Sequence, residues 1–510
     1  MVWRSLLFLG LVSRCLGLSL PYIFSDHMVL QAELGASVWG TASAGSTVEV
    51  GFGGRHVVAR CDGSGRWTAA LGRLPASDVP ETLVVSGDGE QKRFSDVVVG
   101  EVWLCAGQSN MEWALAKELR GVAELQAPAP EGIRIFNPNY PGKLTGGDRF
   151  TSGERGRLTP ERYFEGQWQR GSPEADASVS AIGYYFAKGL HRERGVPVGI
   201  VAIAVGGSPI EAWLAHSALA SDPALKEMVQ GNWLTNSRLE AWCQERARIN
   251  LGDADGASLI SSKVEGGPNH AFKPGFLWDA GIERIAPFAI RGILWYQGES
   301  NSLRRDRVEE YGQLFPLFVS EVRRRWDSPR LPLLCCQLSG IDPASYHSDY
   351  WPEFRDLQRR MASELAGVGM VVTSDVGNEH SVHPLDKRTV ADRLVGLADA
   401  RVYRTGGQEG PVPLEARRLG RGISVSFGGA ASVLRTSDGQ PVREVELVGP
   451  DGKVLPATVS LSGDELILSA DVPGGGQRVH YGWHPYTRGN LVGPSGLPVS
   501  TFDLAIRPEN

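Results

Sequence analysis

The sequence lacks the features that mark several classes of protein. It has no basic run and no stripe of lysines and arginines, and its formal net charge at pH 7 is −6. Because clustered positive charge is what holds a nucleic acid, we expect no nucleic-acid partner. After the N-terminal segment, no stretch reaches the roughly 18 apolar residues of a membrane-spanning helix, so we expect no membrane span. The C-x-x-C pairs of many zinc sites are also missing, and we expect no metal.

Cysteine is scarce, with 6 among 510 residues, and the N-terminus affects how these are counted. Residues 1–17 read MVWRSLLFLGLVSRCLG: an arginine, a short apolar run and then small residues, as in a secretory signal. We therefore expect residues 1–19 to be a signal peptide and the mature protein to be secreted or periplasmic. A buried N-terminal strand is the alternative. If Cys15 leaves with the signal, an odd number of cysteines remains, and the sequence assigns no disulfide among them.

Three regions differ in pattern along a chain that is too long for one core. Residues 20–98 and 408–510 contain short alternating apolar segments between turn residues, which is typical of β-sandwich-like domains. Residues 99–407 instead alternate near-continuous apolar strands with helical stretches. This pattern predicts an α/β domain whose parallel sheet is covered by helices on both faces. Residues 215–275 fit it less well, and we interpret them as an insertion or cap near a substrate cleft.

The stretch WLCAGQSNME, residues 103–112, places a serine directly after a buried strand. Ligands bind where the carboxyl ends of parallel strands meet, so Ser109 stands where a nucleophile is useful. The second glycine of a G-x-S-x-G elbow is missing, because Met111 occupies that position, and this argues against the common α/β-hydrolase arrangement. A serine here also caps a helix well, and the local sequence leaves both roles open.

Polar segments follow other predicted strands as well. Gly207 ends the strand VGIVAIAVGG, and a glycine lets a backbone N–H approach a ligand oxygen closely. Gln297 and Asn301 follow the strand GILWY, and an amide side chain is able to donate to an oxyanion. His383 lies in a loop after the last predicted strand, from which a base would reach the same sheet edge. Each also has a purely structural alternative: a plain turn, a helix cap or a surface histidine.

Together and in this order, these segments resemble the sialate O-acetylesterase family, within the wider SGNH-type hydrolases. The combination of GQSNM with WYQGESN is specific, and the similarity extends over nearly the whole mature chain. The resemblance implies an SGNH/flavodoxin-like three-layer α/β domain that removes acetyl groups from sugar hydroxyls with no metal and no cofactor. The matching stretches are FSDHMVLQ (24–31), VWG (38–40), GEVWLCAGQSNM (100–111), GGSPIEAW (206–213), GILWYQGESN (292–301), WPEFRDLQ (351–358) and HPLDK (383–387), with a fainter match at GLPVSTF (496–502).

The resemblance also implies a role for each segment. Ser109 would be the nucleophile and His383 the general base. The backbone N–H groups of Ser109 and Gly207 would form the oxyanion hole, joined by a side-chain donor, Gln297 or else Asn301. Residues beside these motifs are tentative substrate contacts: Gln108, Asn110, Glu299 and Asn301.

The acid of the triad is not obvious from the sequence. SGNH enzymes usually place an aspartate three residues before the histidine, and this chain has His380 there. Asp375, at the end of the preceding strand, is therefore a tentative acid, and Glu299 and Asp386 are other candidates. A backbone carbonyl that orients the imidazole is a further alternative.

Several functions remain open at this point. The closest rival substrate to a sialoglycan is an acetylated polysaccharide such as xylan. An inactive hydrolase core that only binds carbohydrate is another possibility, and an SGNH core also allows phospholipase or thioesterase activity. Specificity would lie in residues 215–275 and 338–350, and the sequence leaves the oligomeric state undetermined. Aromatic and histidine side chains available for sugar contact in the second segment and next to it are Tyr346, His347, Tyr350 and Trp351.

Overall fold

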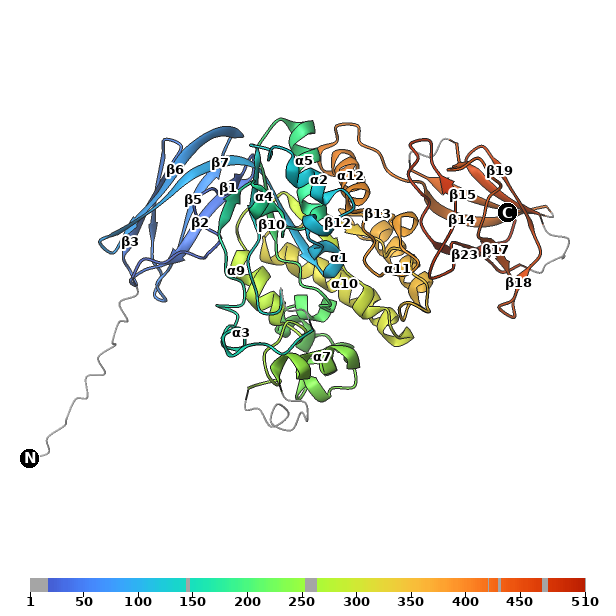
Figure 1. The fold of residues 1–510 in the computed structure, drawn as a ribbon, viewed down its shortest axis with the longest axis horizontal. Coiled ribbons are helices and arrows are strands. Elements are labelled where there is room, and N and C mark those ends of the chain that lie inside the picture. Colours follow the sequence, from blue (N-terminus) through green and yellow to red (C-terminus); the bar gives the residue numbers. More distant parts are fainter. Residues whose placement is uncertain are drawn as a thin grey trace, which may run out of the picture.

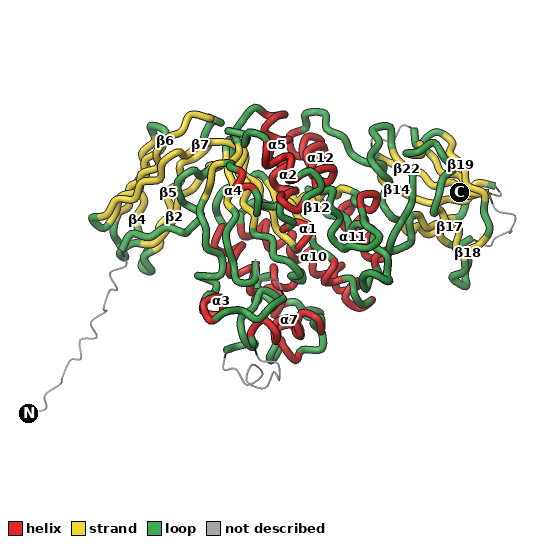
Figure 2. Tube along the Cα trace, in the orientation of Figure 1, coloured by secondary structure: helices red, strands yellow, loops and turns green. Residues whose placement is uncertain are grey.

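The computed structural model describes residues 17–143, 147–252, 264–420, 422–429, 433–469 and 476–509. Most of the predicted signal peptide lies outside the described residues, as does part of the predicted insertion. Figure 1 shows three parts along the long axis: strands at one end, a mixed α/β part in the middle and strands again at the other end. Figure 2 shows that the helices gather in the middle part.

The middle part is built on a sheet whose neighbouring strands run parallel, except at one edge. All neighbours are parallel but β8 and β9, which pair antiparallel. The predicted parallel sheet is therefore confirmed. In spatial order the strands are β13 (Val368–Val371), β12 (Leu333–Cys336), β11 (Gly292–Tyr296), β7 (Glu90–Gly107), β10 (Val198–Ala202), β8 (Ile133–Phe136) and β9 (Trp168–Arg170).

Helices connect these strands and also form the outer layers of the middle part (Figure 1). The α-helices are α1 (Ser109–Glu112), α2 (Gly121–Gln126), α3 (Ser152–Gly156), α4 (Pro173–Asp176), α5 (Ala181–Arg194), α6 (His216–Ser221), α7 (Ala241–Leu251), α9 (Glu283–Ile285), α10 (Arg305–Arg325), α11 (Trp351–Glu364) and α12 (Lys387–Ala398). Short 3₁₀ or π turns are η1 (Leu115–Lys117), η2 (Ile210–Trp213), η3 (Lys226–Val229), η4 (Trp233–Thr235), η5 (Trp278–Ile282), η6 (Glu299–Asn301), η7 (Ser374–Val376) and η8 (Asp399–Tyr403).

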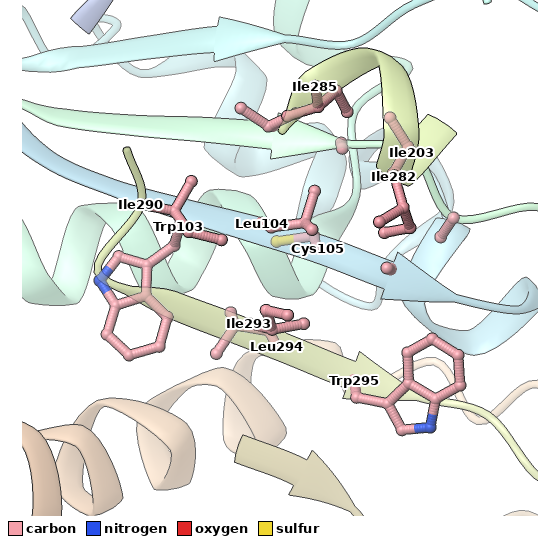
Figure 3. Packing of buried hydrophobic residues seen from close by; sticks show 14 of the residues in the cluster. Trp103, Leu104, Cys105, Ile203, Ile282, Ile285, Ile290, Ile293, Leu294 and Trp295 are labelled. Carbon is pink, nitrogen blue, oxygen red and sulfur yellow. The ribbon is translucent and has the colours of Figure 1, made fainter. Parts of the chain in front are cut away.

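The two faces of the central sheet pack against different helices. Successive side chains of a strand point to opposite faces, and side chains in register on neighbouring strands share a face. Trp103 of β7 packs edge-on against Phe186 of α5, with ring centroids 5.0 Å apart. Trp295 of β11 is in register with Ala106, on the other face, and packs on Phe318 of α10. Figure 3 shows β7 and β11 as neighbouring strands in the core, with Trp103 and Trp295 well apart and Leu104, Cys105, Ile293 and Leu294 between them.

The N-terminal part shares its longest strand with the middle part. The first residues of β7 alternate between exposed and half-buried, but every residue from Val97 to Gly107 is buried. The boundary predicted between residues 98 and 99 therefore falls inside one continuous strand, and a single apolar cluster runs through both parts. The other N-terminal strands are β1 (Val29–Gln31), β2 (Gly35–Thr41), β3 (Thr47–Phe52), β4 (Arg55–Arg60), β5 (Arg66–Arg73) and β6 (Ser77–Gly87).

The C-terminal part has an apolar cluster of its own. Its main sheet is antiparallel apart from β14 and β23, and Arg355 of α11 joins it to the middle part by donating to the carbonyl oxygens of Gly482, His484 and Pro485. Its strands are β14 (Val412–Leu419), β15 (Gly422–Gly428), β16 (Arg435–Thr436), β17 (Val445–Val448), β18 (Val454–Leu455), β19 (Thr458–Ser462), β20 (Glu465–Ser469), β21 (Arg478–Tyr481), β22 (Leu491–Val492) and β23 (Phe502–Arg507).

Two further expectations from the sequence concern disulfides and membranes. The described cysteines, at positions 61, 105, 243, 335 and 336, are all free and buried, so none of them forms a disulfide with another. Within the described ranges, no helix combines the length and the apolar character needed to cross a membrane.

Candidate active site

Ser109 lies at the carboxyl end of the central sheet, as the first residue of α1. Gly107, which ends β7, has a φ of 125°. A Cβ atom added there would lie 2.2 Å from the carbonyl oxygen of Tyr296 on β11, so the close approach of the two strand ends requires glycine. The N–H of Gln108 then donates to that same oxygen at 2.9 Å. The sheet thus fixes the backbone immediately before the serine.

The predicted base lies within hydrogen-bond distance of the predicted nucleophile. The Nε2 atom of His383 lies 2.8 Å from the Oγ atom of Ser109. Burial, together with the charges of Lys387 and Lys117, lowers the pKa of His383 to about 4. The imidazole is therefore neutral at pH 7 and is able to accept the serine proton through Nε2.

Trp113 is a functional neighbour that the sequence did not point to. Its ring stacks on the imidazole of His383, with centroids 5.0 Å apart and planes 22° from parallel. Stacking of this kind restricts the tilt of the imidazole. The only sequence signal was that Trp113 follows the GQSNM motif by two residues, which says nothing about a loop 270 residues away.

Asp375 is not brought to His383, and its prediction as the acid is wrong. Its carboxylate forms a two-pronged ion pair with Arg393 of α12, at 2.7 and 2.6 Å. Asp386, another candidate, caps α12 through the N–H of Thr389 and binds Arg120. Among the described residues, no carboxylate hydrogen-bonds the imidazole of His383. Within the described ranges, the site is thus a serine–histidine pair with no acid bound to the ring.

Two backbone N–H groups are free to bind an oxyanion. Those of Ser109 and Gly207 form no hydrogen bond within the described part of the chain. The carbonyl of Gly207 accepts from the hydroxyl of Ser300 at 2.9 Å, which orients that peptide. The neighbouring N–H of Gly206 is occupied, because it donates to the carboxylate of Glu112 at 2.7 Å. This geometry agrees with the predicted pair of backbone donors.

The predicted side-chain donors, Gln297 and Asn301, do not face the cavity. Gln297 is fully buried, and its Nε2 atom donates to Asn301, Gln108 and the carbonyl of Ser208. Asn301 is also fully buried and uses its Nδ2 atom to bind Glu211. Both predictions are wrong for the same reason: these amide groups donate their hydrogen bonds to protein groups beneath the site. Burial of the segment QGESN, which η6 folds inward, was not evident from its polar sequence.

Gln108 is the amide that borders the cavity beside the serine. Its Oε1 atom accepts from the backbone N–H groups of Gly298 and Ser300, each at 3.3 Å, and from Gln297. Because the two backbone N–H groups only donate, they fix the orientation of the Gln108 amide. Its Nε2 atom donates to no described residue and is not among the buried polar atoms without a partner. A hydrogen-bond donor is therefore held toward the cavity.

The other tentative contacts divide between the cavity and the protein interior. Asn110 is fully buried and does not border the cavity; its amide binds Glu299, Lys387 and the carbonyl of Val382. Glu299 borders the cavity, yet one of its oxygens is held by Asn110. Burial raises the pKa of Glu299.

A cavity of about 530 Å³ opens above the pair. Its walls come from the sheet edge, from the predicted insertion and from the loop after β12, so the insertion does border the site. Trp242 and Phe272 of the insertion crowd the α-carbon of Gly207: a Cβ added there would lie 2.7 and 3.1 Å from their rings. The remaining wall residues include Glu112, Tyr140, Lys143, Phe150, Tyr163, Arg246, Asn250, His270, Leu303, Tyr346 and His347.

Of the segment proposed to contact sugar, the first half faces the cavity. Tyr346 and His347 line it, whereas Trp351 is fully buried behind Tyr346, with ring centroids 5.8 Å apart. Tyr350 lies outside the cavity, near Arg305.

Burial raises the pKa of Glu112, whose carboxylate also binds the hydroxyl of Tyr140. Sequence reasoning missed Glu112, although it belongs to the stretch WLCAGQSNME.

Comparison with known proteins identifies similar chains. Residues 254–401 match a family of carbohydrate esterases described as sialic acid-specific acetylesterases. The sialate O-acetylesterase of Rattus norvegicus is 27% identical over 82% of this chain and 80% of its own length. That of Homo sapiens is 25% identical over 79% of this chain and 74% of its own length. A solved carbohydrate acetylesterase from Xanthomonas citri is 27% identical, with a TM-score of 0.75 over 95% of this chain and 99% of its own.

Proposed function

Given the confirmed resemblance to sialate O-acetylesterases, we propose that this chain is a serine carbohydrate O-acetylesterase. The observation that carries the proposal is the distance of 2.8 Å between Ser109 Oγ and His383 Nε2 at the wall of a cavity. Two unoccupied backbone N–H groups beside the serine add an oxyanion hole. A nucleophile, a base and oxyanion donors are the parts that acyl transfer to serine requires.

The reaction follows from the positions of these groups. Ser109 Oγ attacks the acetyl carbonyl while His383 Nε2 takes its proton, and the N–H groups of Ser109 and Gly207 bind the resulting oxyanion. The intermediate collapses, the C–O bond to the sugar breaks, and the sugar oxygen takes the proton from His383. Water then attacks the acetyl-serine with His383 again as base, which releases acetate and restores Ser109.

Gln108 is the third oxyanion donor in this proposal, in place of Gln297. Its oxygen is held by backbone donors at the end of β11, which leaves Nε2 at the cavity wall next to Ser109. A side-chain amide fixed in this way needs no reorganisation when negative charge develops on the substrate oxygen.

The substrate we propose is an acetyl ester on a sugar hydroxyl, with O-acetyl sialic acid first and an acetylated polysaccharide such as xylan second. Aromatic side chains together with Glu112, Arg246 and His347 on the cavity walls fit a polar ring with apolar faces. These walls hold several charged and polar groups, and a long acyl chain would leave them without partners.

The proposal extends to architecture and location. Helices on both faces of the central sheet support an SGNH/flavodoxin-like three-layer domain with sandwich-like β parts on either side. The N-terminal sequence supports a cleaved signal and a secreted or periplasmic protein. Sequencing the N-terminus of the protein collected outside the cytoplasm tests the second point, with a start near residue 20 expected.

Hydrolysis of p-nitrophenyl acetate tests the catalytic proposal. We expect Ser109→Ala to lower kcat by at least about 10⁴-fold, with unchanged thermal unfolding. Equal rates for the two proteins would leave only a carbohydrate-binding role. Acetate release from O-acetyl sialic acids and from acetylated xylo-oligosaccharides, measured side by side, then ranks the two substrates.

A further inference from the structure

In the part of the chain that the structure describes, the base of the proposed pair has no acidic partner on its ring. In a serine triad a carboxylate hydrogen-bonds the imidazole and orients it. The Nδ1 atom of His383 has no hydrogen-bond partner in the described part of the chain, and the charges that act on the ring are the cations Lys387 and Lys117. A base that is out of place by about 1 Å costs on the order of 10²-fold in rate, so some other group must hold it.

One side chain connects the nucleophile helix to the loop that carries the base. Asn110 follows Ser109 directly, and its Nδ2 atom donates to the carbonyl oxygen of Val382 at 3.0 Å. Val382 immediately precedes His383. Within the same turn, the hydroxyl of Ser381 accepts from the N–H of His383 at 3.2 Å and donates to its carbonyl oxygen at 3.3 Å. Asn110 therefore links α1 to the peptide bond that precedes the base. Ser381 adds hydrogen bonds within the loop, to the backbone of His383 itself.

Two buried ionisable side chains fix the amide of Asn110. Its Nδ2 atom also donates to Glu299 at 2.5 Å, and its Oδ1 atom accepts from the ammonium of Lys387 at 2.5 Å. The carbonyl of Val382 only accepts, so a flipped amide would lose that bond in any protonation state. Burial lowers the pKa of Lys387 to about 7 and raises that of Glu299; with Lys387 as an ammonium and Glu299 as a carboxylate, the flip would lose the other two bonds as well. All three side chains are almost completely buried, at 0 to 1% exposure, which makes an unmade bond costly.

The rest of the imidazole environment is apolar or cationic. Trp113 stacks on the ring, and the ammonium of Lys387 lies 5.7 Å from the centroid of that same tryptophan. The tryptophan restricts the tilt of the imidazole, whereas the Asn110 contact restricts the backbone that carries it. Neither contact would be replaced by Asp375, which stays with Arg393.

We infer that Asn110 is the positioning residue of His383, with Glu299 and Lys387 holding its amide in the orientation that binds the Val382 carbonyl. The inference rests on the proposed Ser109–His383 chemistry. In a triad the third group binds the ring of the base. Here it binds the peptide bond before the base, so position is set through the loop and the ring keeps a free Nδ1 atom.

The arrangement also predicts how the charges around His383 set its titration. Lys387 and Lys117 act on the ring, and both disfavour its protonated form. Removing the charge of Lys387 therefore raises the pKa of His383, and activity is then lost at a higher pH as the solution is acidified. Other titratable groups line the same cavity as His383: Glu112, Tyr140, Lys143, Tyr163, Arg246, His270, Glu299, Tyr346 and His347.

Asn110→Asp in the full chain is the main test, because it keeps the shape and the oxygen that Lys387 binds but removes both donated hydrogen bonds. With p-nitrophenyl acetate we expect kcat to fall about 10²-fold and KM to stay nearly constant. The matched control is Asp375→Asn, which alters the acid expected from the sequence; its kcat and pH profile should equal those of the wild type.

Lys387→Met is the second variant and keeps the test decisive if Asn110→Asp does not fold. We expect a loss of about tenfold in kcat and an acid limb of kcat/KM moved to higher pH. The inference is overturned if a folded Asn110→Asp protein has the kcat of the wild type. It is also overturned if Lys387→Met changes neither kcat nor the pH of the acid limb of kcat/KM. If Ser109→Ala also retains wild-type activity, the proposed function has failed and the inference falls with it. If Ser109→Ala is inactive, the inference alone has failed.

Discussion

Two segments meet at the site, and they are held by different means. The nucleophile segment, residues 107–112, is fixed by the sheet: Gly107 lies against Tyr296, and the register of β7 with β11 sets where the strand stops. The base loop, residues 377–386, lies outside the sheet and is held by scattered contacts: the side chains of Asn110 and Trp113 and single backbone hydrogen bonds, such as that from the N–H of Leu119 to the carbonyl of Leu385. A strand end is positioned by repeated backbone hydrogen bonds, whereas a loop is positioned by a few specific contacts.

This difference predicts different consequences of mutation. A change of backbone at the strand end, at Gly107, should lower both folding stability and activity. A change around the base loop should leave the free energy of unfolding nearly intact and lower the rate alone. The following predictions test that contrast, from the largest expected effect to the smallest.

Gly107→Ala should have the largest effect on folding stability. The new Cβ would meet the Tyr296 carbonyl oxygen at 2.2 Å, at a φ of 125° that alanine rarely adopts. We expect the free energy of unfolding in urea to fall by about 3 kcal/mol or more. Gly406→Ala is the matched control, because its φ is 95° but no atom lies within 4 Å of the added Cβ. Equal losses in the two variants would show that strand contact plays no part.

Gln108→Glu should come next and should act on kcat. A glutamate keeps an oxygen for the N–H groups of Gly298 and Ser300 but loses the donor and brings negative charge toward the oxyanion. We expect kcat to fall by about 10²–10³-fold with p-nitrophenyl acetate. A rate near that of the wild type would mean that Gln108 only supports the end of β11.

The pH dependence of the wild type follows from the environment of His383. Burial and two lysines lower its pKa from 6.5 to about 4, and the neutral form is the active one. As the pH falls, kcat/KM should therefore stay level well below 6.5 and drop only as it passes through about 4. Initial rates in buffers of constant ionic strength measure this limb. A limb near pH 6.5 would contradict the proposed environment.

Trp113→Leu should have the smallest effect of the series. Loss of the ring stacked on His383 removes roughly 1 kcal/mol of contact, or about fivefold in kcat. Trp113→Phe keeps an aromatic face and should recover most of the rate. Thermal unfolding of both variants should match the wild type, and a large drop in stability would place Trp113 with the nucleophile segment instead.

The sequence predicted what depends on local pattern. Apolar strands separated by helices indicated a parallel sheet, and polar segments after those strands indicated the edge where Ser109 and Gly207 lie. The boundary predicted at residue 98 falls within β7, because the composition changes halfway along that strand while the backbone continues.

What the sequence could not predict depends on contacts between distant residues. The position of Asp375 at a strand end makes it a candidate acid, yet Arg393, eighteen positions further on, binds its carboxylate. Gln297 was expected in the oxyanion hole, but η6 turns it under the site. The contact of Asn110 with the carbonyl of Val382 spans 272 positions, and a backbone acceptor leaves no sequence signal at all.

Mapping the acetyl group on the enzyme tests the central claim most directly. The protein is mixed with p-nitrophenyl acetate, quenched in acid within the first turnovers, digested and examined by mass spectrometry. We expect one added acetyl group on the peptide that contains Ser109, and none there in Ser109→Ala. Full esterase activity with the acetyl group on another residue, or with no acetylated peptide and an active Ser109→Ala protein, would contradict catalysis by the Ser109–His383 pair.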